Sequence, residues 1–182
     1  MKGEIFVAFV DLVENEFGLE VADAVLSHPS LASGGSYSRT GTYPHSEMVT
    51  LVVALTERTG ASASALQRTF GQFLFSDLMR SHTRHAEAFK DCFSLIQAIH
   101  GTIHNHVRVL YPDASLPTIS VTTEGADVLT VKYSSERGFA HVCHGLIEGC
   151  IDHFGESISI EAALPGDEPL INEASFRLTR SN

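Results

Sequence analysis

The sequence predicts an α+β protein in which a series of helices precedes a sheet. Apolar residues recur at helical spacing over about the first 110 residues, and alternating, β-branched segments appear only after them. A single amphipathic helix lies among the predicted strands. Helices grouped ahead of strands favour an α+β arrangement over a parallel α/β sheet, in which the two kinds of element would alternate along the chain.

The first helices are bounded by residues that commonly end helices. Residues 2–18 carry apolar side chains at helical spacing and end at Gly18. A short helix follows at about 21–26 and stops near Pro29. Residues 30–44 are rich in Ser, Gly, Thr and Tyr, which predicts a long loop.

Three more helices are expected before the sheet begins. Residues 46–59 are followed by a glycine that can end a helix. Residues 62–78 begin with Ser62, which is a suitable N-cap. Residues 85–110 form a long helical region that ends before a Tyr-Pro pair.

Alternating β-branched segments then predict four strands. The predicted strands cover residues 118–123, 128–133, 157–162 and 175–179. Residues 124–127 form the turn between the first two strands. Residues 136–154 have the amphipathic pattern of a helix, which Gly155 would end.

Composition restricts the class of protein. The chain has 182 residues, 43% of them hydrophobic, which suits one domain, or one domain of two lobes, with room for a buried cofactor. Its net charge of −10 disfavours nucleic acid and anionic membrane surfaces as partners. The first residues do not have the pattern of a signal peptide, and no apolar run approaches the roughly 20 residues that span a bilayer. We therefore expect a soluble, cytoplasmic protein, with its three cysteines reduced.

His104 lies within the apolar helical stretch 99–107, one helical turn after His100. A histidine on the apolar face of a helix suits a metal buried in an apolar cleft, and the pair could also form a two-histidine metal site. The residues between them are Gly, Thr and Ile, so the zinc-protease pattern is missing. The plain alternative is a histidine that caps a helix or satisfies polar groups in a core.

Tyr133, Ser135 and Arg137 form a Y-x-S-x-R motif at a predicted strand-to-helix junction. An arginine binds a carboxylate through two parallel charge-assisted hydrogen bonds, and hydroxyl groups can complete the shell. The alternative is an ordinary helix cap beside solvated charges. Haem b, with its iron and two propionates, is a ligand that fits both this motif and His104.

These signals together resemble the H-NOX family, the haem nitric oxide/oxygen-binding domains. The resemblance runs from the start of the chain to Gly149 and includes Pro117, thirteen residues after His104. It implies one H-NOX domain over residues 1–182. An N-terminal helical lobe, about 1–60, would pack on a larger lobe, about 61–182, that contains a four-stranded antiparallel sheet, with haem between the lobes.

The resemblance also implies a role for each candidate site residue. His104 would be the axial ligand of a ferrous haem b iron, and Tyr133, Ser135 and Arg137 would bind the propionates. Pro117 matches the position that presses on a pyrrole and holds the porphyrin out of plane. The side chains expected to enclose the porphyrin are Ile5, Phe9, Phe70, Phe73, Leu74, Leu78, Ile103, Leu116, Pro117, Val142 and Leu146.

The expected distal pocket is apolar. Oxygen-binding members of the family carry a distal tyrosine assisted by two polar positions, and these positions match Val142, Phe9 and Leu74 here. His141 and His144 flank Val142, but neighbours on a helix point about 100° apart. A distal hydrogen-bond donor stabilises bound O₂, whereas NO needs none. We therefore expect the haem to bind NO and CO and to exclude O₂.

The implied function is gas sensing and not catalysis. NO would weaken the bond between the iron and His104, the porphyrin would relax away from Pro117, and the lobes would rotate. A separate partner would read this change, by family analogy a histidine kinase or a cyclic-di-GMP enzyme. The alternatives are an O₂-binding sensor or carrier, a haem-handling protein, and a metal-binding or structural module that uses His100 and His104.

Some members of the family also carry a structural zinc site of cysteines and a histidine near the C-terminus. Ala140 falls near the position of the first zinc ligand, and residues 160–182 contain neither Cys nor His. The expected cofactor is therefore haem alone, without zinc.

Overall fold

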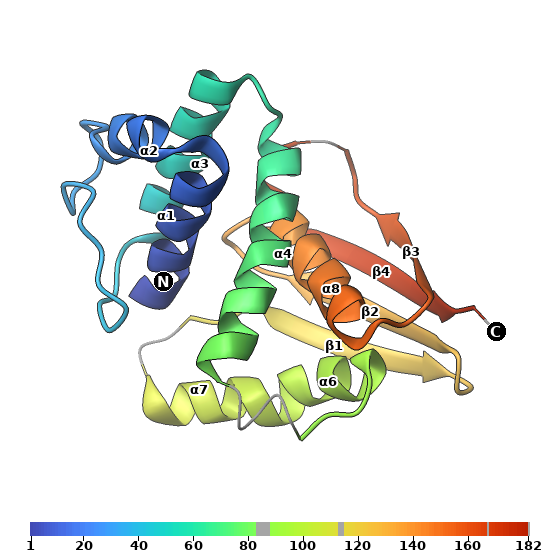
Figure 1. Cartoon of the computed structure of the whole chain (residues 1–182). Coiled ribbons are helices and arrows are strands. Elements are labelled where there is room, and N and C mark those ends of the chain that lie inside the picture. The colour runs from blue at the N-terminus through green and yellow to red at the C-terminus, as the bar shows by residue number, and fades with distance from the viewer. Residues whose placement is uncertain (83–87, 113–114, 167, 182) are drawn as a thin grey trace.

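The N-terminal helices pack on one side of a long central helix, and a sheet with its own helices lies on the other side (Figure 1). The computed structural model describes residues 1–82, 88–112, 115–166 and 168–181. Within these residues, no helix is long and apolar enough to cross a membrane.

The N-terminal half confirms the predicted order of helices. Its helices are α1 (Gly3–Phe17), α2 (Leu19–Leu26), α3 (His45–Thr59) and α4 (Ala63–Ser81). Gly18 and Gly60 adopt positive φ angles of 84° and 73°, so each can end a helix where other residues would be strained. The Ser62 hydroxyl accepts a hydrogen bond from the Ala65 N–H and caps α4, as the sequence predicts.

The helical region predicted over residues 85–110 is present from Cys92 to Leu110, but it starts later than predicted and is not a uniform α-helix. Residues 85–87 lie outside the described part of the chain, and the region beyond them contains three successive segments. These are α6 (Cys92–Ala98), the π-helix η1 (Ile99–Ile103) and α7 (His104–Leu110). Asp91 starts α6 because its carboxylate accepts a hydrogen bond from the Ser94 N–H at 2.8 Å. Gly101, a poor helix former, lies in the middle of the π-helix.

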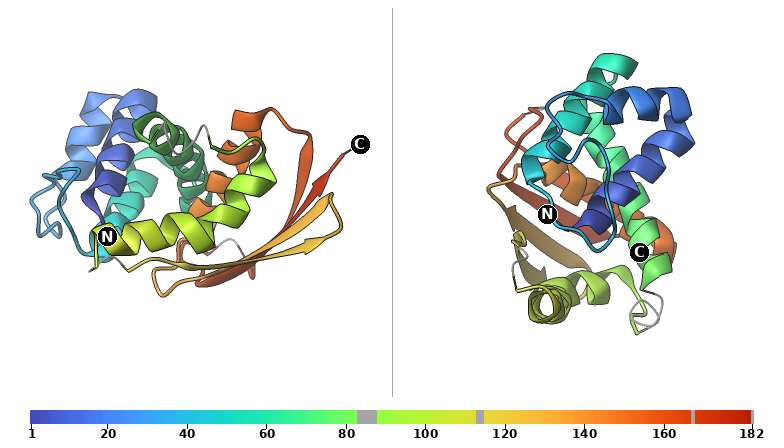
Figure 2. Two further views of the ribbon diagram at one scale, coloured as in Figure 1. Left: turned by 90° about the horizontal axis from the view of Figure 1, so that it is seen from below. Right: turned by 90° about the vertical axis from the view of Figure 1, so that its left-hand side faces the viewer.

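The four predicted strands are confirmed and form one antiparallel sheet. The strands are β1 (Thr118–Glu124), β2 (Val128–Ser134), β3 (Ile158–Ala163) and β4 (Glu173–Arg180), in the order β1-β2-β4-β3. Helix α8 (Ala140–Phe154) lies against one face of the sheet (Figure 2). It begins later than the predicted residue 136, because Gly138 adopts a φ of 74° and directs the chain into a loop first.

Buried apolar side chains form two clusters. One cluster joins α1, α2 and α3 to Leu66, Phe70 and Leu74 of α4. The other cluster joins α6, α8 and the sheet, and it includes the buried Phe75 from α4. Leu146 of α8 packs against both clusters. The lobe boundary expected near residue 60 stays a prediction, and the helical cluster itself extends along α4.

Helices α4 and α8 approach so closely that their backbones touch. A Cβ atom added at Gly71 would lie 2.3 Å from the Val142 carbonyl oxygen, and one at Gly145 would lie 1.9 Å from the Arg68 carbonyl oxygen. Neither oxygen belongs to a flexible side chain that could move aside. The two glycines are therefore required for this contact.

We expect Gly145→Ala to lower the free energy of unfolding by about 1–3 kcal/mol, because the added methyl group forces α8 away from α4. Gly166→Ala is the matched control, since a Cβ atom there meets nothing within 4 Å. Urea denaturation of both variants measures the effect. Equal stability of the two would mean that the helices separate without cost.

Candidate functional site

His104 stands at a change of helix type. It is the first residue of α7, and its N–H donates to the Ile99 carbonyl oxygen across the end of the π-helix. Its side chain is half-buried. Single π-helical turns are frequently found at functional sites, which makes this position notable independently of the sequence motif. The His100 side chain lies outside the described part of the structure, so the two-histidine alternative is not tested.

The hydroxyls of Tyr133 and Ser135, from the Y-x-S-x-R motif, stabilise the loop between β2 and α8. Tyr133 is buried at the end of β2, and its hydroxyl accepts a hydrogen bond from the Phe139 N–H at 3.2 Å. Burial raises the pKa of Tyr133, so its phenol is neutral at physiological pH. The Ser135 hydroxyl accepts a hydrogen bond from the Arg137 N–H at 3.2 Å. Both side chains therefore hold Arg137 in a defined loop.

Arg137 links this loop to the segment that follows α7. Its Nη2 atom donates a hydrogen bond to the carbonyl oxygen of Ser115, which is two residues before Pro117. Burial lowers the pKa of the Arg137 guanidinium. No Asp or Glu pairs with it in the ranges that the structure describes. A partly desolvated cation without a carboxylate partner is a good place for an anionic ligand group.

The expected apolar wall comes from three helices. Phe9 of α1 and Phe70 of α4 are buried, and their rings meet edge to face with centroids 5.2 Å apart. Leu74 is buried beside them in the helical cluster, and Val142 of α8 packs against the same cluster. None of these side chains carries a hydrogen-bond donor.

The other predicted apolar residues fall into separate groups. Ile5, Phe73 and Leu78 are partly buried against the helical cluster, Ile103 against the sheet-side cluster, and Leu146 against both. Leu116 and Pro117 are half-buried in the segment before β1. The predicted residues thus occupy the helical wall, the start of α7 and the loops joined by Arg137.

Sequence reasoning missed two partners of this region. Phe139 is buried in the helical cluster and donates its N–H to the Tyr133 hydroxyl. Ser115 supplies the carbonyl oxygen that Arg137 binds. A backbone donor and a backbone acceptor leave no signal in residue types, so only the folded chain reveals them.

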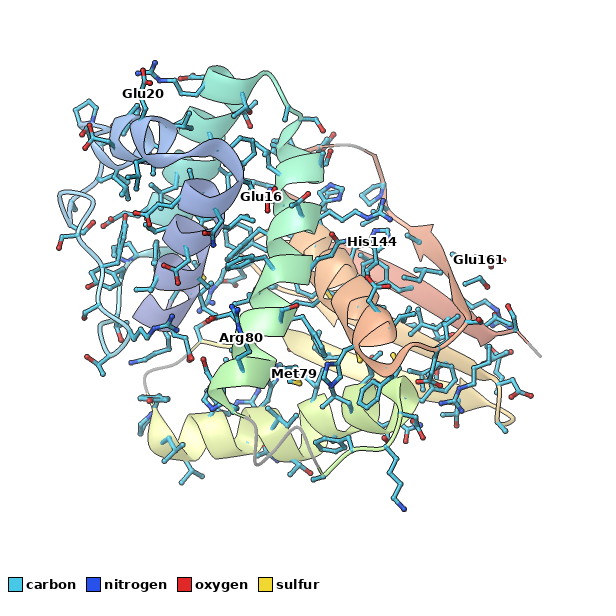
Figure 3. All side chains as sticks on the ribbon, viewed as in Figure 1. Glu16, Glu20, Met79, Arg80, His144 and Glu161 are labelled. Carbon is cyan, nitrogen blue, oxygen red and sulfur yellow. The ribbon has the colours of Figure 1, made fainter. Side chains whose placement is uncertain are left out.

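Both histidines beside Val142 have partners elsewhere. The His141 Nε2 atom lies 3.0 Å from the Glu168 carbonyl oxygen. The centroids of the His144 ring and the Phe176 ring of β4 lie 5.3 Å apart, and Figure 3 labels His144 beside α8. Both rings therefore have contacts of their own, and the expectation that neither serves the distal pocket stays a prediction.

The donor set fits haem. An iron porphyrin needs an imidazole, a cation for its propionates and an extensive apolar surface. His104, Arg137 with its two hydroxyls, and the wall of Phe9, Phe70 and Val142 supply groups of these kinds. A fold and a residue set of this type suit a haem-binding domain.

Comparison with known proteins identifies the family. The chain matches the family model described as Haem-NO-binding over residues 2–162. The Fe(II) unliganded H-NOX protein from K. algicida shares 35% identity, covering 100% of this chain and 97% of that one, with a TM-score of 0.91. The H-NOX from Shewanella woodyi shares 35% sequence identity, covering 100% of this chain and 95% of that one, with a TM-score of 0.82. The H-NOX protein from S. oneidensis shares 28% sequence identity, covering 100% of each chain, with a TM-score of 0.86.

The chain therefore belongs to the H-NOX family of haem-binding gas-sensor domains. The predicted α+β fold with its four-stranded antiparallel sheet is confirmed. No protein of curated function matches the sequence.

The buried position of His144 predicts a pH effect on stability. Burial, reinforced by Arg68, lowers the pKa of His144 below its usual 6.5. Above pH 6.5 the histidine is neutral in both the folded and the unfolded chain. As the pH falls below 6.5 the unfolded chain takes up the proton first, so stability is lost towards the lower folded-state pKa.

His144→Gln should therefore flatten the fall in unfolding free energy between pH 7 and pH 5.5. The exposed His45 provides the control variant His45→Gln, which should retain the slope of the unaltered protein. Urea denaturation at several pH values tests this, and identical slopes for all three proteins would contradict it.

Proposed function

We propose that this protein is a haem-based sensor that binds NO and CO at ferrous haem b and excludes O₂. Haem would supply the iron atom that binds the gas. The observation that carries the proposal is the donor-free wall formed by Phe9, Leu74 and Val142. Bound O₂ is polar and depends on a distal hydrogen-bond donor, whereas NO and CO bind ferrous haem without one.

The chain's own residues would hold the haem at three places. His104 would ligate the iron, and Arg137 with Tyr133 and Ser135 would bind the propionates. Ile5, Leu116 and Pro117, with the apolar wall, would pack on the porphyrin. The partly desolvated guanidinium of Arg137, which has no carboxylate partner among the described residues, supports the assignment of the propionates.

The signal would come from release of His104 when NO binds. His104 begins α7, and the segment after α7 is tied through Ser115 to Arg137. Release at one end of this helix would change how its lobe packs on the helical lobe and allow the lobes to rotate. A separate protein would read the change, by family analogy a histidine kinase or a cyclic-di-GMP enzyme. We propose no catalytic role for this chain.

Two related proteins support the choice of gases. The S. oneidensis H-NOX has been solved in the Fe(II)NO ligation state, and the S. woodyi H-NOX in the Fe(II)CO state. The rival functions are an O₂-binding sensor or carrier and a haem-handling protein. Both share the cofactor but differ in their response to gas.

Absorption spectra of the reduced protein separate these functions. We expect the Soret band to be unchanged in air and to shift under NO and under CO. A stable oxygenated spectrum in air would indicate an O₂-binding protein instead. Haem that transfers readily to an acceptor protein without any gas-selective response would indicate haem handling.

His104→Gly should abolish the bond between the protein and the iron, and added imidazole should restore the spectrum of the unaltered protein. Imidazole can replace the missing ring because glycine leaves space for it. His45→Gly, on the exposed start of α3, is the control and should leave the spectrum unchanged. An unaltered spectrum for His104→Gly would remove this residue as the ligand.

Arg137→Ala should speed haem dissociation by about ten-fold or more, since charge-assisted hydrogen bonds contribute about 1.5–3 kcal/mol each. Arg58→Ala, which removes an exposed arginine from α3, is the matched control. The measurement is haem transfer to an excess of a haem-free acceptor protein. Equal rates for both variants would reduce the motif to a loop-capping role.

A further inference from the structure

The C-terminal end of α7 carries an exposed apolar patch. Val109, Leu110 and Tyr111 are consecutive, and 78%, 71% and 40% of their surfaces are exposed; we call them the α7 patch. The other large apolar side chains exposed in the described part of the chain, Leu19, Val53 and Leu170, are isolated along the sequence. Single exposed apolar side chains are normal on soluble proteins, whereas several at one place can mark an interaction site.

The α7 patch meets the helical lobe through one contact. The Lys2 Nζ atom lies 4.2 Å from the centroid of the Tyr111 ring, which is the distance of a cation–π interaction. The same Nζ atom donates a hydrogen bond to the Thr42 hydroxyl at 2.9 Å. In Figure 2 (left) the N-terminus lies in line with this end of α7. The surface around the patch therefore includes residues from the end of α7 and from the N-terminal helical part of the chain.

Two cations lie beside the α7 patch. The chain has 22 acidic and 12 basic residues, yet residues 92–112 contain no Asp or Glu. Arg108 is exposed next to the patch, and its Nη1 atom donates to the Asn105 side chain at 3.1 Å. Lys2 supplies a second cation over Tyr111. Within the described ranges, the charged side chains placed next to this apolar surface are thus the cations Arg108 and Lys2, on a protein that is acidic as a whole.

We propose that the α7 patch is a docking site for an amphipathic helix of a partner protein that carries carboxylates beside its apolar face. Apolar side chains of that helix would cover Val109 and Leu110, which are large enough to serve as anchors. The carboxylates would lie near Arg108 and Lys2, where the charges are complementary. A partner of basic character would instead be repelled at this surface and favoured elsewhere on the protein.

The link between docking and gas sensing rests on the proposed function. The α7 patch and His104 lie at opposite ends of the same seven-residue helix. Release of His104 would shift the patch relative to Lys2, so the partner helix would bind the two states with different affinities.

Two synthetic helical peptides test the docking site on the haem-loaded, unliganded protein. Both carry the same leucines at positions i, i+3, i+4 and i+7; one has glutamates beside them and the other has lysines. Fluorescence anisotropy should show the acidic peptide binding at least ten-fold more tightly. The net charge of −10 opposes this preference, so only a local positive surface can produce it. Equal affinities, tighter binding of the basic peptide, or no binding would overturn the proposal.

Matched variants locate the binding surface. Leu110→Ser should weaken the acidic peptide at least ten-fold, and Arg108→Glu should remove the preference for it. Leu19→Ser is the control, because Leu19 is 73% exposed against 71% for Leu110 but lies on α2. Loss of binding in Leu19→Ser, or none in Leu110→Ser, would contradict a site on α7. Circular dichroism verifies that the variants are folded.

Repeating the titration under NO separates the docking site from its regulation. A change in peptide affinity, with a shifted Soret band, supports coupling between His104 and the α7 patch. An unchanged affinity with a shifted Soret band contradicts the coupling, while the docking site is judged by the unliganded titrations alone. An unshifted Soret band would contradict the proposed function and leave the docking result standing.

Discussion

The contact between α4 and α8 determines the positions of most other parts of this protein. Gly71 and Gly145 bring the two backbones together where side chains would otherwise separate them. This contact brings Phe70 and Leu74 of α4 into the cluster against which Val142 packs. Close packing of glycines gains contact area but leaves no side chain to adjust, so the relative position of the helices is strongly restricted.

Polar side chains at the edge of this contact add to the restriction. The Glu148 carboxylate accepts hydrogen bonds from Arg68 and from Gln72, the latter at 2.9 Å, so one residue of α8 binds two residues of α4. The His144 Nε2 atom lies 3.9 Å from the same carboxylate. Because these groups are only partly exposed, their interactions are less screened by solvent than those of surface pairs. The α4–α8 pair therefore forms a rigid support for the more loosely held helices around it.

Most of the elements could be predicted from residue patterns, since their apolar periodicity and their caps agree. The pattern over residues 85–110 predicted a helical region but not its division into three segments, because helical periodicity does not distinguish one long helix from α-helices joined by a π-turn. The prediction also placed the start of α8 too early, because the positive φ angle of Gly138 is decided by the loop and not by helix propensity. In the candidate site, residue types identified Tyr133 and Arg137. The Arg137 contact with the Ser115 carbonyl depends on chain folding alone.

The weak packing of α7 is a property that sensing could use. An isolated helix of seven residues is unstable in water, so α7 depends on the contacts at its ends. At its start it follows the π-helix, and at its end Tyr111 meets Lys2, while Val109 and Leu110 bury little surface. When few contacts hold a segment on the rest of the protein, the free energy needed to detach that segment is small. A ligand that removes one contact can then shift the population of such a helix, whereas the α4–α8 pair would not respond.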